Sequence, residues 1–346
     1  MAKIKEFLKR KDIVFSPKRY GIDALGAMAQ GLFCSLLVGT IVKTLGQQLA
    51  AQFLVDVGDF ASAMSGAAMA VAIGYALKAP ALVLFSLATV GYAANSLGGA
   101  GGPLAVLIIA IVAAEAGKAV SKETKVDILV TPIVTILVGV GLAALIAAPI
   151  GQAASAVGNF IKWATNMQPL LMGILVSVTV GIALTLPISS AAICAALGLT
   201  GLAGGAAVAG CCAQMVGFAV MSFRENRWGG LVAQGVGTSM LQMPNIIKNP
   251  KIWIPPTLAS AITGPLATCL FKLEMNGAPV SSGMGTCGFV GQIGVITGWA
   301  DKTVTAMDWI GLVLISFVLP AILTWLIAVP LRKWGWIKEN DLKLDL

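Results

Sequence analysis

Long apolar stretches, separated by short clusters of charge, run through this sequence from residue 21 to residue 330. Hydrophobic residues make up 58% of the chain and charged residues only 11%. An average soluble domain is about one quarter charged, so a soluble protein is excluded. The unbroken apolar runs also differ from the strands of a membrane β-barrel, which alternate over about ten residues. The sequence therefore predicts a polytopic membrane protein built from helices.

The apolar stretches set the expected number of membrane crossings. A helix needs roughly 20 apolar residues to span a bilayer, so we expect an all-α fold with about 10 transmembrane helices, within a range of about 8–12. Short or glycine-broken segments fit re-entrant hairpins equally well, notably 188–200, 230–245 and 279–299. The predicted segments are 21–45, 60–78, 80–97, 103–120, 128–150, 169–186, 188–200, 202–222, 230–245, 254–271, 279–299 and 308–330.

Basic residues gather at the two ends of the membrane region. Seven of the 23 Lys and Arg residues precede residue 20. The positive-inside rule places such clusters in the cytoplasm, so the net charge of +8 reports topology and not nucleic-acid binding. We expect a cytoplasmic N-terminal segment (1–19), one integral membrane domain (20–331) and a cytoplasmic tail (332–346). Residues 151–168 are too polar to span and are expected to form an interfacial amphipathic helix.

Glycine and proline recur at a constant offset of 107 residues, although chance matches arise easily in a chain with 40 glycines. The motif LPISSA at 186–191 also resembles APVSSG at 278–283, which suggests a third copy. Internal repeats with broken helices are typical of secondary transporters. The possible repeats are 21–125, 126–228 and 229–331. The offset pairs Gly66 with Gly173, Gly74 with Gly181, Pro80 with Pro187, Gly91 with Gly198 and Gly98 with Gly205.

Three glycine-rich breaks interrupt the apolar segments, at 95–103, 197–205 and 276–291. Pro103 suits the first position of a helix, which would leave the amides of Gly101 and Gly102 free to face the break. Such helix ends can hold a polar or anionic group, and we extend this expectation to Gly283 and Gly285. Irregular backbone at membrane depth occurs only where protein or a watery cavity satisfies it. The alternative is close helix packing by small residues.

Polar side chains accompany these breaks and form the predicted substrate site. Amides, hydroxyls and one carboxylate can donate to and accept from the hydroxyls of a polar solute. A single membrane Ser often bonds its own backbone instead. Glu274 could equally be a solvated loop acid paired with Lys272, and Glu115 is expected near the cytoplasmic surface beside Lys118. The candidate residues are Asn95, Ser96, Ser189, Ser190, Gln214, Glu274, Asn276, Ser281, Ser282 and Gln292, with Gln242 and Asn245 nearby.

Several kinds of chemistry are not expected. The chain has six cysteines, no C-x-x-C pair and no histidine, so we expect no metal site and no cofactor. It lacks a P-loop, a dinucleotide fingerprint and a nucleophile elbow, which excludes a transporter that hydrolyses ATP by itself. An enzyme in its own right is the least favoured class.

The basic N-terminus, the apolar bundle and the stretches NSLGGAGGP and APVSSG resemble the enzyme IIC-like membrane proteins of the bacterial sugar phosphotransferase system. The resemblance is greatest to the branch described as IIC type 2-like or perfringolysin regulator-like, over about residues 20–330. It implies a homodimer in the inner membrane with a sugar-type site at the hairpin tips. It also implies that Glu274 stands where the family has a glutamate, whereas the family's histidine is missing. Any phosphoryl donor would then be a separate carrier protein.

Three functions follow as hypotheses. The first is a multi-pass permease of the IIC type in the bacterial cell membrane, which binds a sugar or sugar-like acid and alternates its access. The second is a membrane sensor or regulator that signals through the basic N-terminal segment. The third is a channel for ions or small solutes, for which small residues and few charges suffice.

Overall fold

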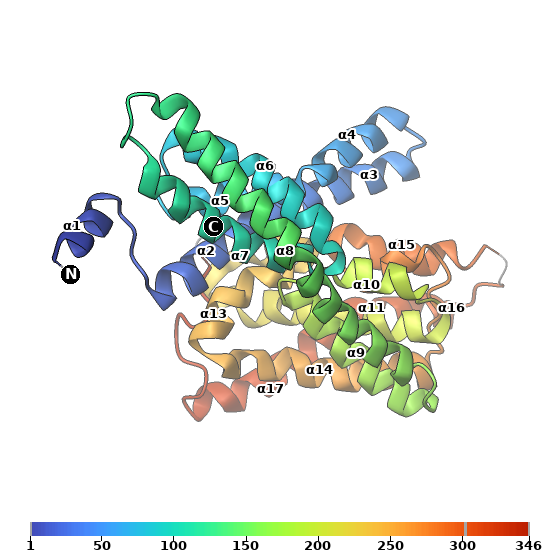
Figure 1. Ribbon diagram of the computed structural model, residues 1–346. Coiled ribbons are helices and arrows are strands. Elements are labelled where there is room, and N and C mark those ends of the chain that lie inside the picture. The colour runs from blue at the N-terminus through green and yellow to red at the C-terminus, as the bar shows by residue number, and fades with distance from the viewer. Residues whose placement is uncertain (1, 301–302, 345–346) are drawn as a thin grey trace. The chain divides into compact units, whose positions relative to one another are not determined.

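The computed structural model describes residues 2–300 and 303–344, and every regular element within these ranges is a helix (Figure 1). An isolated β-bridge joins Gly201 to Met275. The predicted all-α class is thereby confirmed. Five helical stretches among the described residues are long and apolar enough to cross a membrane, or six if one bent pair is counted as a span. The expected count of about 10 crossings is therefore not confirmed.

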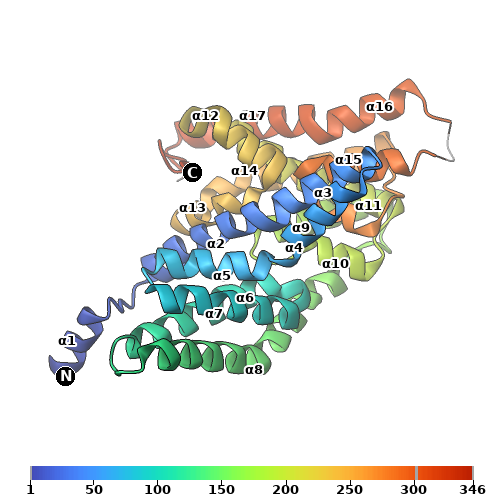
Figure 2. The same cartoon turned by 90° about the horizontal axis from the view of Figure 1, so that it is seen from above.

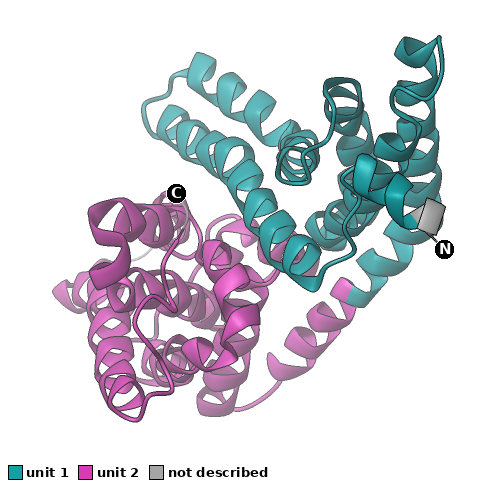
Figure 3. Ribbon diagram, turned by 90° about the vertical axis from the view of Figure 1, so that its left-hand side faces the viewer, with its two compact units in different colours: residues 1–153 teal, residues 154–346 magenta. Residues whose placement is uncertain are grey.

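The chain divides into two compact units, residues 1–153 and 154–346 (Figure 3). Helix α8 (Asp127–Ala164) begins in the first unit and ends in the second. It includes most of the segment expected to be a separate interfacial helix, which instead continues an apolar helix without a break.

Unit 1 begins with α1 (Ala2–Arg10) and continues as a helical stretch over Arg19–Gln48. That stretch consists of α2 (Ala24–Leu32) and α3 (Val38–Gln48), each preceded by a π-helical turn. The next two helices, α4 (Gln52–Ala63) and α5 (Ser65–Ala76), meet at an angle of 48°. Helix α4 packs on α3, and α5 packs on α2.

Glycines allow these helices to touch through their backbones. A side chain at Gly66 would collide with the carbonyl oxygen of Gly91, and one at Gly91 with the carbonyl oxygen of Gly66. The same is true of Gly58 against Gly39. Such close approach is how small residues stabilise helix pairs in membranes, where no hydrophobic force drives them together.

Helices α6 (Ala81–Gly98) and α7 (Gly102–Val120) form a tight hairpin, which Figure 2 shows as two neighbouring ribbons. Together with the turn Gly99–Gly101 between them, they form the 40-residue stretch Ala81–Val120, which counts as one span by length and composition. The direction reverses at Gly99, whose φ of +50° favours glycine, so that Val83 near the start of α6 lies against Gly117 near the end of α7. Pro103 occupies the first turn of α7, as predicted.

Unit 2 is built around α11 (Gly201–Met221), which is buried along most of its length. Helices α9 (Pro169–Thr185), α14 (Ile254–Pro265) and α17 (Leu319–Lys333) pack against it. A side chain at Gly210 would collide with the carbonyl of Ser177 on α9. Helix α14 continues to Leu270 as a π-helical turn, and α16 (Ala306–Val313) leads into α17.

The remaining parts of unit 2 are short and irregular, where the sequence predicts broken segments. The first is α10 (Ser190–Leu197), and the last is the stretch from η8 (Pro279–Gly283) to α15 (Val290–Thr297). Between them, α12 (Phe223–Val232) and α13 (Met243–Lys248) are linked by single turns, η4 (Ala233–Gly237) and η5 (Ser239–Gln242).

The proposed internal repeat is not confirmed. The offset pairs α6, which is 18 residues long and continuous, with α10, which has 8 residues and is followed by a break. Gly91 packs on Gly66, whereas its counterpart Gly198 has open space beside its Cα. Gly91 and Gly198 therefore serve different local structures.

Candidate functional site

Two broken segments of unit 2 meet tip to tip and bond each other through serines. The hydroxyl of Ser190, at the start of α10, donates to the carbonyl of Gly283 at 2.8 Å. In return, the hydroxyl of Ser282 donates to the carbonyl of Leu199 at 2.6 Å. Ser189 caps α10 by accepting the amide of Ala192 at 3.2 Å. We call the segments 189–199 and 281–285, joined in this way, the serine crossing.

Glycines make the serine crossing possible because its two segments approach backbone to backbone. A side chain at Gly283 would collide with the backbone of Ser190, and one at Gly285 with the backbone of Cys211. Gly285 also has a φ of +53°, which a larger residue rarely adopts. Ser281 and Ser282 are both buried. These two glycines therefore permit packing, a role that sequence analysis offered as the alternative to ligand binding.

Glu274 and Asn276 lie beside the crossing and are exposed. The side chain of Asn276 accepts the amide of Gly201 at 3.1 Å and donates to the carboxylate of Glu274 at 3.0 Å. Met275 between them is buried and exchanges two backbone hydrogen bonds with Gly201. The extended backbone thus points alternate side chains to opposite sides, which leaves a carboxylate and an amide together on the accessible side.

Gln214 lies deeper, at the centre of a polar network on α11. Its side-chain oxygen accepts from Trp253 at 2.9 Å and from Thr185 at 3.3 Å. The hydroxyl of Thr185 also bonds that of Ser239 at 2.8 Å, and the Gln214 amide lies 3.5 Å from Ser260. Sequence analysis missed these partners because Trp253 fits an aromatic belt equally well and the others are single hydroxyls on separate helices.

Gln292 is buried at a separate position, close to α11 and to the π-helical turn η10 (Leu314–Val318) that precedes α17. Its amide donates to the hydroxyl of Ser316 at 3.0 Å and to the sulfur of Cys212 at 3.2 Å. Its carbonyl oxygen has no hydrogen-bond partner among the residues that the structure describes. A buried acceptor without a partner is costly, so this oxygen is available to a donor from outside the chain.

The predicted site residues of unit 1 lie at the turn between α6 and α7. Asn95 donates to the hydroxyl of Ser65 at 3.4 Å, and Ser96 is exposed. Gly101 and Gly102 are buried, and the amide of Gly102 donates to the carbonyl of Gly99. That amide is therefore not free to bind a ligand as expected, because the tight turn uses it to close its own backbone.

No group of three or more His, Cys, Asp or Glu side chains in the described parts of the chain could hold a metal ion. Cys194, Cys211, Cys212 and Cys287 are buried among apolar and glycine-rich segments. The environment of these four fits the predicted role of small packing residues, whereas Cys34 and Cys269 are exposed.

The family described as "Phosphotransferase system, EIIC" has a sequence model that matches residues 22–344. No curated protein matches the chain, and no solved structure matches it. The matched range includes both units, the serine crossing and most of the C-terminal tail. It agrees with the long apolar helices, which make the chain an integral membrane protein. The chain belongs to the phosphotransferase system EIIC family.

Proposed function

We propose that this chain is the membrane permease of a phosphotransferase-type system and that it moves a small polar solute, a sugar or a sugar-like acid, by alternating access. The observation that carries the proposal is the family match over residues 22–344, combined with paired, glycine-broken segments in unit 2. Transporters of several folds bind their substrates where helices are broken, because backbone groups freed there can bond the solute.

The solute site that we propose is centred on the accessible pair Glu274 and Asn276 beside the serine crossing. A carboxylate and an amide offer both acceptors and donors to neighbouring hydroxyl groups. The remaining predicted contacts are Ser189, Ser190, Ser281 and Ser282 at the crossing, and Gln214 and Gln292 in the core. The amides of Gly283 and Gly285 at the crossing are further predicted contacts of this site. Asn95, Ser96 and Gly101 at the turn between α6 and α7 are a separate prediction in unit 1, where the amide of Gly102 is already bonded to Gly99.

Phosphoryl transfer, if it accompanies transport, needs separate carrier proteins. The chain has no histidine, and no described element forms a soluble carrier domain. We also propose a homodimer in the bacterial inner membrane with a cytoplasmic N-terminus, on the basis of the family and the basic first residues.

The first test is ligand binding by the purified protein. Sugars, sugar acids and other polar metabolites are screened by thermal shift in detergent. A ligand present at 100 times its Kd stabilises the folded protein by about 2.7 kcal/mol. We expect a specific ligand whose effect disappears in Glu274→Ala and Asn276→Ala but persists in Glu6→Ala, an exposed acid at the other end of the chain. A ligand that stabilises both variants as much as it stabilises the wild type would contradict this site.

Uptake into vesicles then separates the hypotheses of function. A permease accumulates the solute at a saturable rate, with or without added phosphoryl carriers. A sensor binds the solute without moving it, and a channel gives single-channel currents in a planar bilayer.

A further inference from the structure

The C-terminal tail, residues 335–344, follows α17 without forming a regular helix and lies along the irregular part of unit 2. Ile337 and Leu342 are its buried apolar anchors. The surface beneath it belongs to α12, the turns that follow and α13. We call this surface, residues 226–249, the amide cradle, because side-chain amides supply its contacts with the tail.

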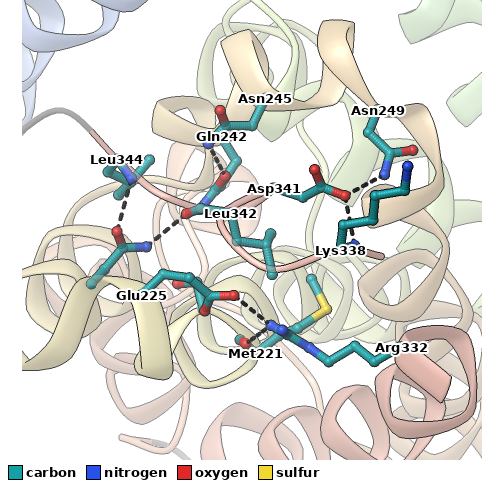
Figure 4. Close-up of polar contacts among 12 residues, drawn as sticks. Met221, Glu225, Gln242, Asn245, Asn249, Arg332, Lys338, Asp341, Leu342 and Leu344 are labelled. Carbon is teal, nitrogen blue, oxygen red and sulfur yellow. Dashed lines mark hydrogen bonds and ion pairs between the residues drawn. The ribbon is translucent and has the colours of Figure 1, made fainter. Parts of the chain in front are cut away.

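The amides of the cradle bond the main chain of the tail (Figure 4). Asn226 donates to the carbonyl of Leu342 at 2.8 Å and accepts the amide of Leu344 at 2.8 Å. Gln242 donates to the same Leu342 carbonyl at 3.0 Å, and Asn245 donates to the carbonyl of Lys343 at 2.8 Å. These side chains bond main-chain groups that face away from the turns at residues 338–343, so the cradle recognises the backbone of a turned peptide segment.

The cradle amides are themselves aligned by one another. Asn245 donates to the side-chain oxygen of Gln242 at 2.9 Å, and Gln242 donates to that of Gln234 at 2.9 Å. Gln234 in turn donates to the hydroxyl of Ser222 at 2.9 Å. A connected network of this kind fixes each amide in one orientation, which prepares the cradle for its ligand.

A second anchor lies at the start of the tail. Asn249 donates to the carbonyl of Trp336 at 2.9 Å and to the carboxylate of Asp341 at 2.7 Å. That carboxylate also accepts the amide of Lys338 at 2.7 Å and so closes the tail into a turn. The side chain of Lys251 lies over the ring of Trp336, 5.1 Å from its centre.

The segment under the tail has little regular structure of its own. Helix α12 has 10 residues, α13 has 6, and the turns between them have 5 and 4. Arg227 within α12 has a φ of +51°, a conformation that non-glycine residues rarely adopt. Short helices are marginal without tertiary contacts. The bonds to the tail therefore add to the packing of η4 and η5 against α11 in ordering residues 223–249.

A cavity of about 680 Å³ lies between the tail and the helices behind it. The tail residues Lys338, Glu339 and Lys343 form one side of it, and Glu225 and Arg332 form the other. Glu225 pairs with Arg332 at 3.0 Å, as Figure 4 shows. The tail therefore borders this cavity between its buried anchors Ile337 and Leu342, and its release would break the hydrogen bonds of the cradle and expose these two side chains.

We propose that residues 335–344 are a releasable strap, an intramolecular peptide ligand that holds the 223–249 segment in its ordered state. With the strap docked the cradle is rigid, and with the strap released the 223–249 segment is free to rearrange. This inference is independent of the solute site, because it concerns contacts among residues that the proposed solute does not need.

The test is hydrogen exchange with mass spectrometry on the full chain in nanodiscs. Gln242→Leu and Asn245→Leu each remove tail contacts, and Asn166→Leu is the control, because the Asn166 amide bonds only its own turn. Each lost hydrogen bond should raise opening of the tail and of 223–249 about fivefold. Exchange in α9 and α14 should not change. Equal exchange of 223–249 in both variants and the control would overturn the proposal.

A second arm keeps the proposal testable if those substitutions disturb folding. The chain is truncated after Trp334, and a synthetic peptide with the sequence of residues 335–344 is added. We expect truncation to increase exchange of 223–249 and the peptide to restore protection, whereas a scrambled peptide does not. If truncation instead loosens all of unit 2 and the peptide restores nothing, the tail is part of the core and not a strap.

Discussion

The two ends of the chain are held to their own units by different chemistry. In unit 1, the residues after α1 are held by charge: the Lys118 ammonium, only 2% exposed, donates to the carbonyls of Asp12 at 2.7 Å and Leu77 at 3.0 Å. In unit 2, the tail is held by neutral amides. We call residues 10–20 with their contacts the charged clasp, in contrast to the amide cradle.

Two cations of the charged clasp, Lys118 and Arg19, each bond a carboxylate and at least one backbone carbonyl. Lys118 also pairs with Glu115 at 3.0 Å, which in turn accepts the hydroxyl of Tyr20 at 3.0 Å. Arg19 bonds the carboxylate of Asp12 and the carbonyl of Leu77, both at 2.6 Å. A buried charge is tolerated only when it is paired and hydrogen-bonded, so every missing partner carries a large penalty. A neutral amide loses less when its partner leaves. The comparison therefore predicts that the charged clasp contributes more to stability than the amide cradle. It also predicts that pH and salt affect the clasp more than the cradle.

The largest effect is expected from Lys118→Met, which keeps the length of the side chain and removes its charge. The substitution leaves Glu115 buried without its cation, which should destabilise unit 1 by about 3–5 kcal/mol. Thermal unfolding in detergent measures the loss, with Lys122→Met as the control because Lys122 is exposed. Equal melting temperatures of the two variants would show that the clasp does not depend on this ammonium.

A smaller effect is expected from Asn226→Leu in the cradle. The change leaves the Leu342 carbonyl and the Leu344 amide with fewer partners, at a cost of about 1–3 kcal/mol. The same unfolding assay applies, and proteolysis of the tail gives a local readout. If this variant loses more stability than Lys118→Met, the order of the two regions is reversed and the comparison fails.

Acid should weaken the charged clasp more than the amide cradle. The Arg19 guanidinium beside Asp12 holds the pKa of that carboxyl below its usual 3.8, and Lys11 and Arg10 lower the pKa of Glu123 from 4.5. Both carboxyls have a lower pKa in the folded protein than in the unfolded chain. Their ion pairs therefore stabilise the fold fully at a pH above the unfolded-state pKa, and this stabilisation is lost as the pH falls through the folded-state pKa. We expect hydrogen exchange of residues 10–20 to increase below about pH 4.

The amide contacts of Asn226, Gln242 and Asn245 carry no titratable group, unlike the second anchor at the Asp341 carboxylate, and provide the internal reference in the same acid series. Exchange at residues 342–344 should keep its ordinary pH dependence over that range. A parallel loss of protection at both ends would mean that acid acts on the whole fold and not on the clasp.

The smallest effect is expected at the solvent-exposed edge of the clasp. Arg10 and Glu123 pair at 2.7 Å, but both side chains are substantially exposed. Arg10→Ala should cost less than about 1 kcal/mol, and raising the ionic strength should remove the difference from wild type. A salt-independent loss would indicate that Arg10 acts through its packing on the Phe7 ring, 5.5 Å away, and not through charge.

Much of the local structure could be predicted from the sequence. Apolar stretches predicted α6, α7, α9, α11 and the continuous helical stretch Ala306–Lys333, which includes α16 and α17, to within a few residues. The glycine-rich breaks were recognised because glycine and proline act locally, and the pairing of Glu115 with Lys118 follows from their spacing of three residues on one helix.

Contacts between distant segments could not be predicted. The Asn226 amide and the Leu342 carbonyl are 116 residues apart, and nothing in the identity of either residue indicates that the two bond each other. The serines of the crossing stood out as a repeated motif, but nothing in PISSA or PVSSG indicates that each hydroxyl bonds the other segment. The expected count of about 10 crossings is not confirmed, and short apolar segments such as 188–200 can turn back as readily as they can span.

The serine crossing also determines when unit 2 can be completed during synthesis. The Ser190 hydroxyl bonds a carbonyl that lies 93 residues further along the chain. At the usual rate of translation, the ribosome needs on the order of ten seconds to make that length. During this interval the tip of α10 lacks the segment to which it bonds. Joining of the two tips therefore comes late in synthesis, and slow translation of residues 200–283 would prolong the period in which Ser190 and Leu199 lack their partners.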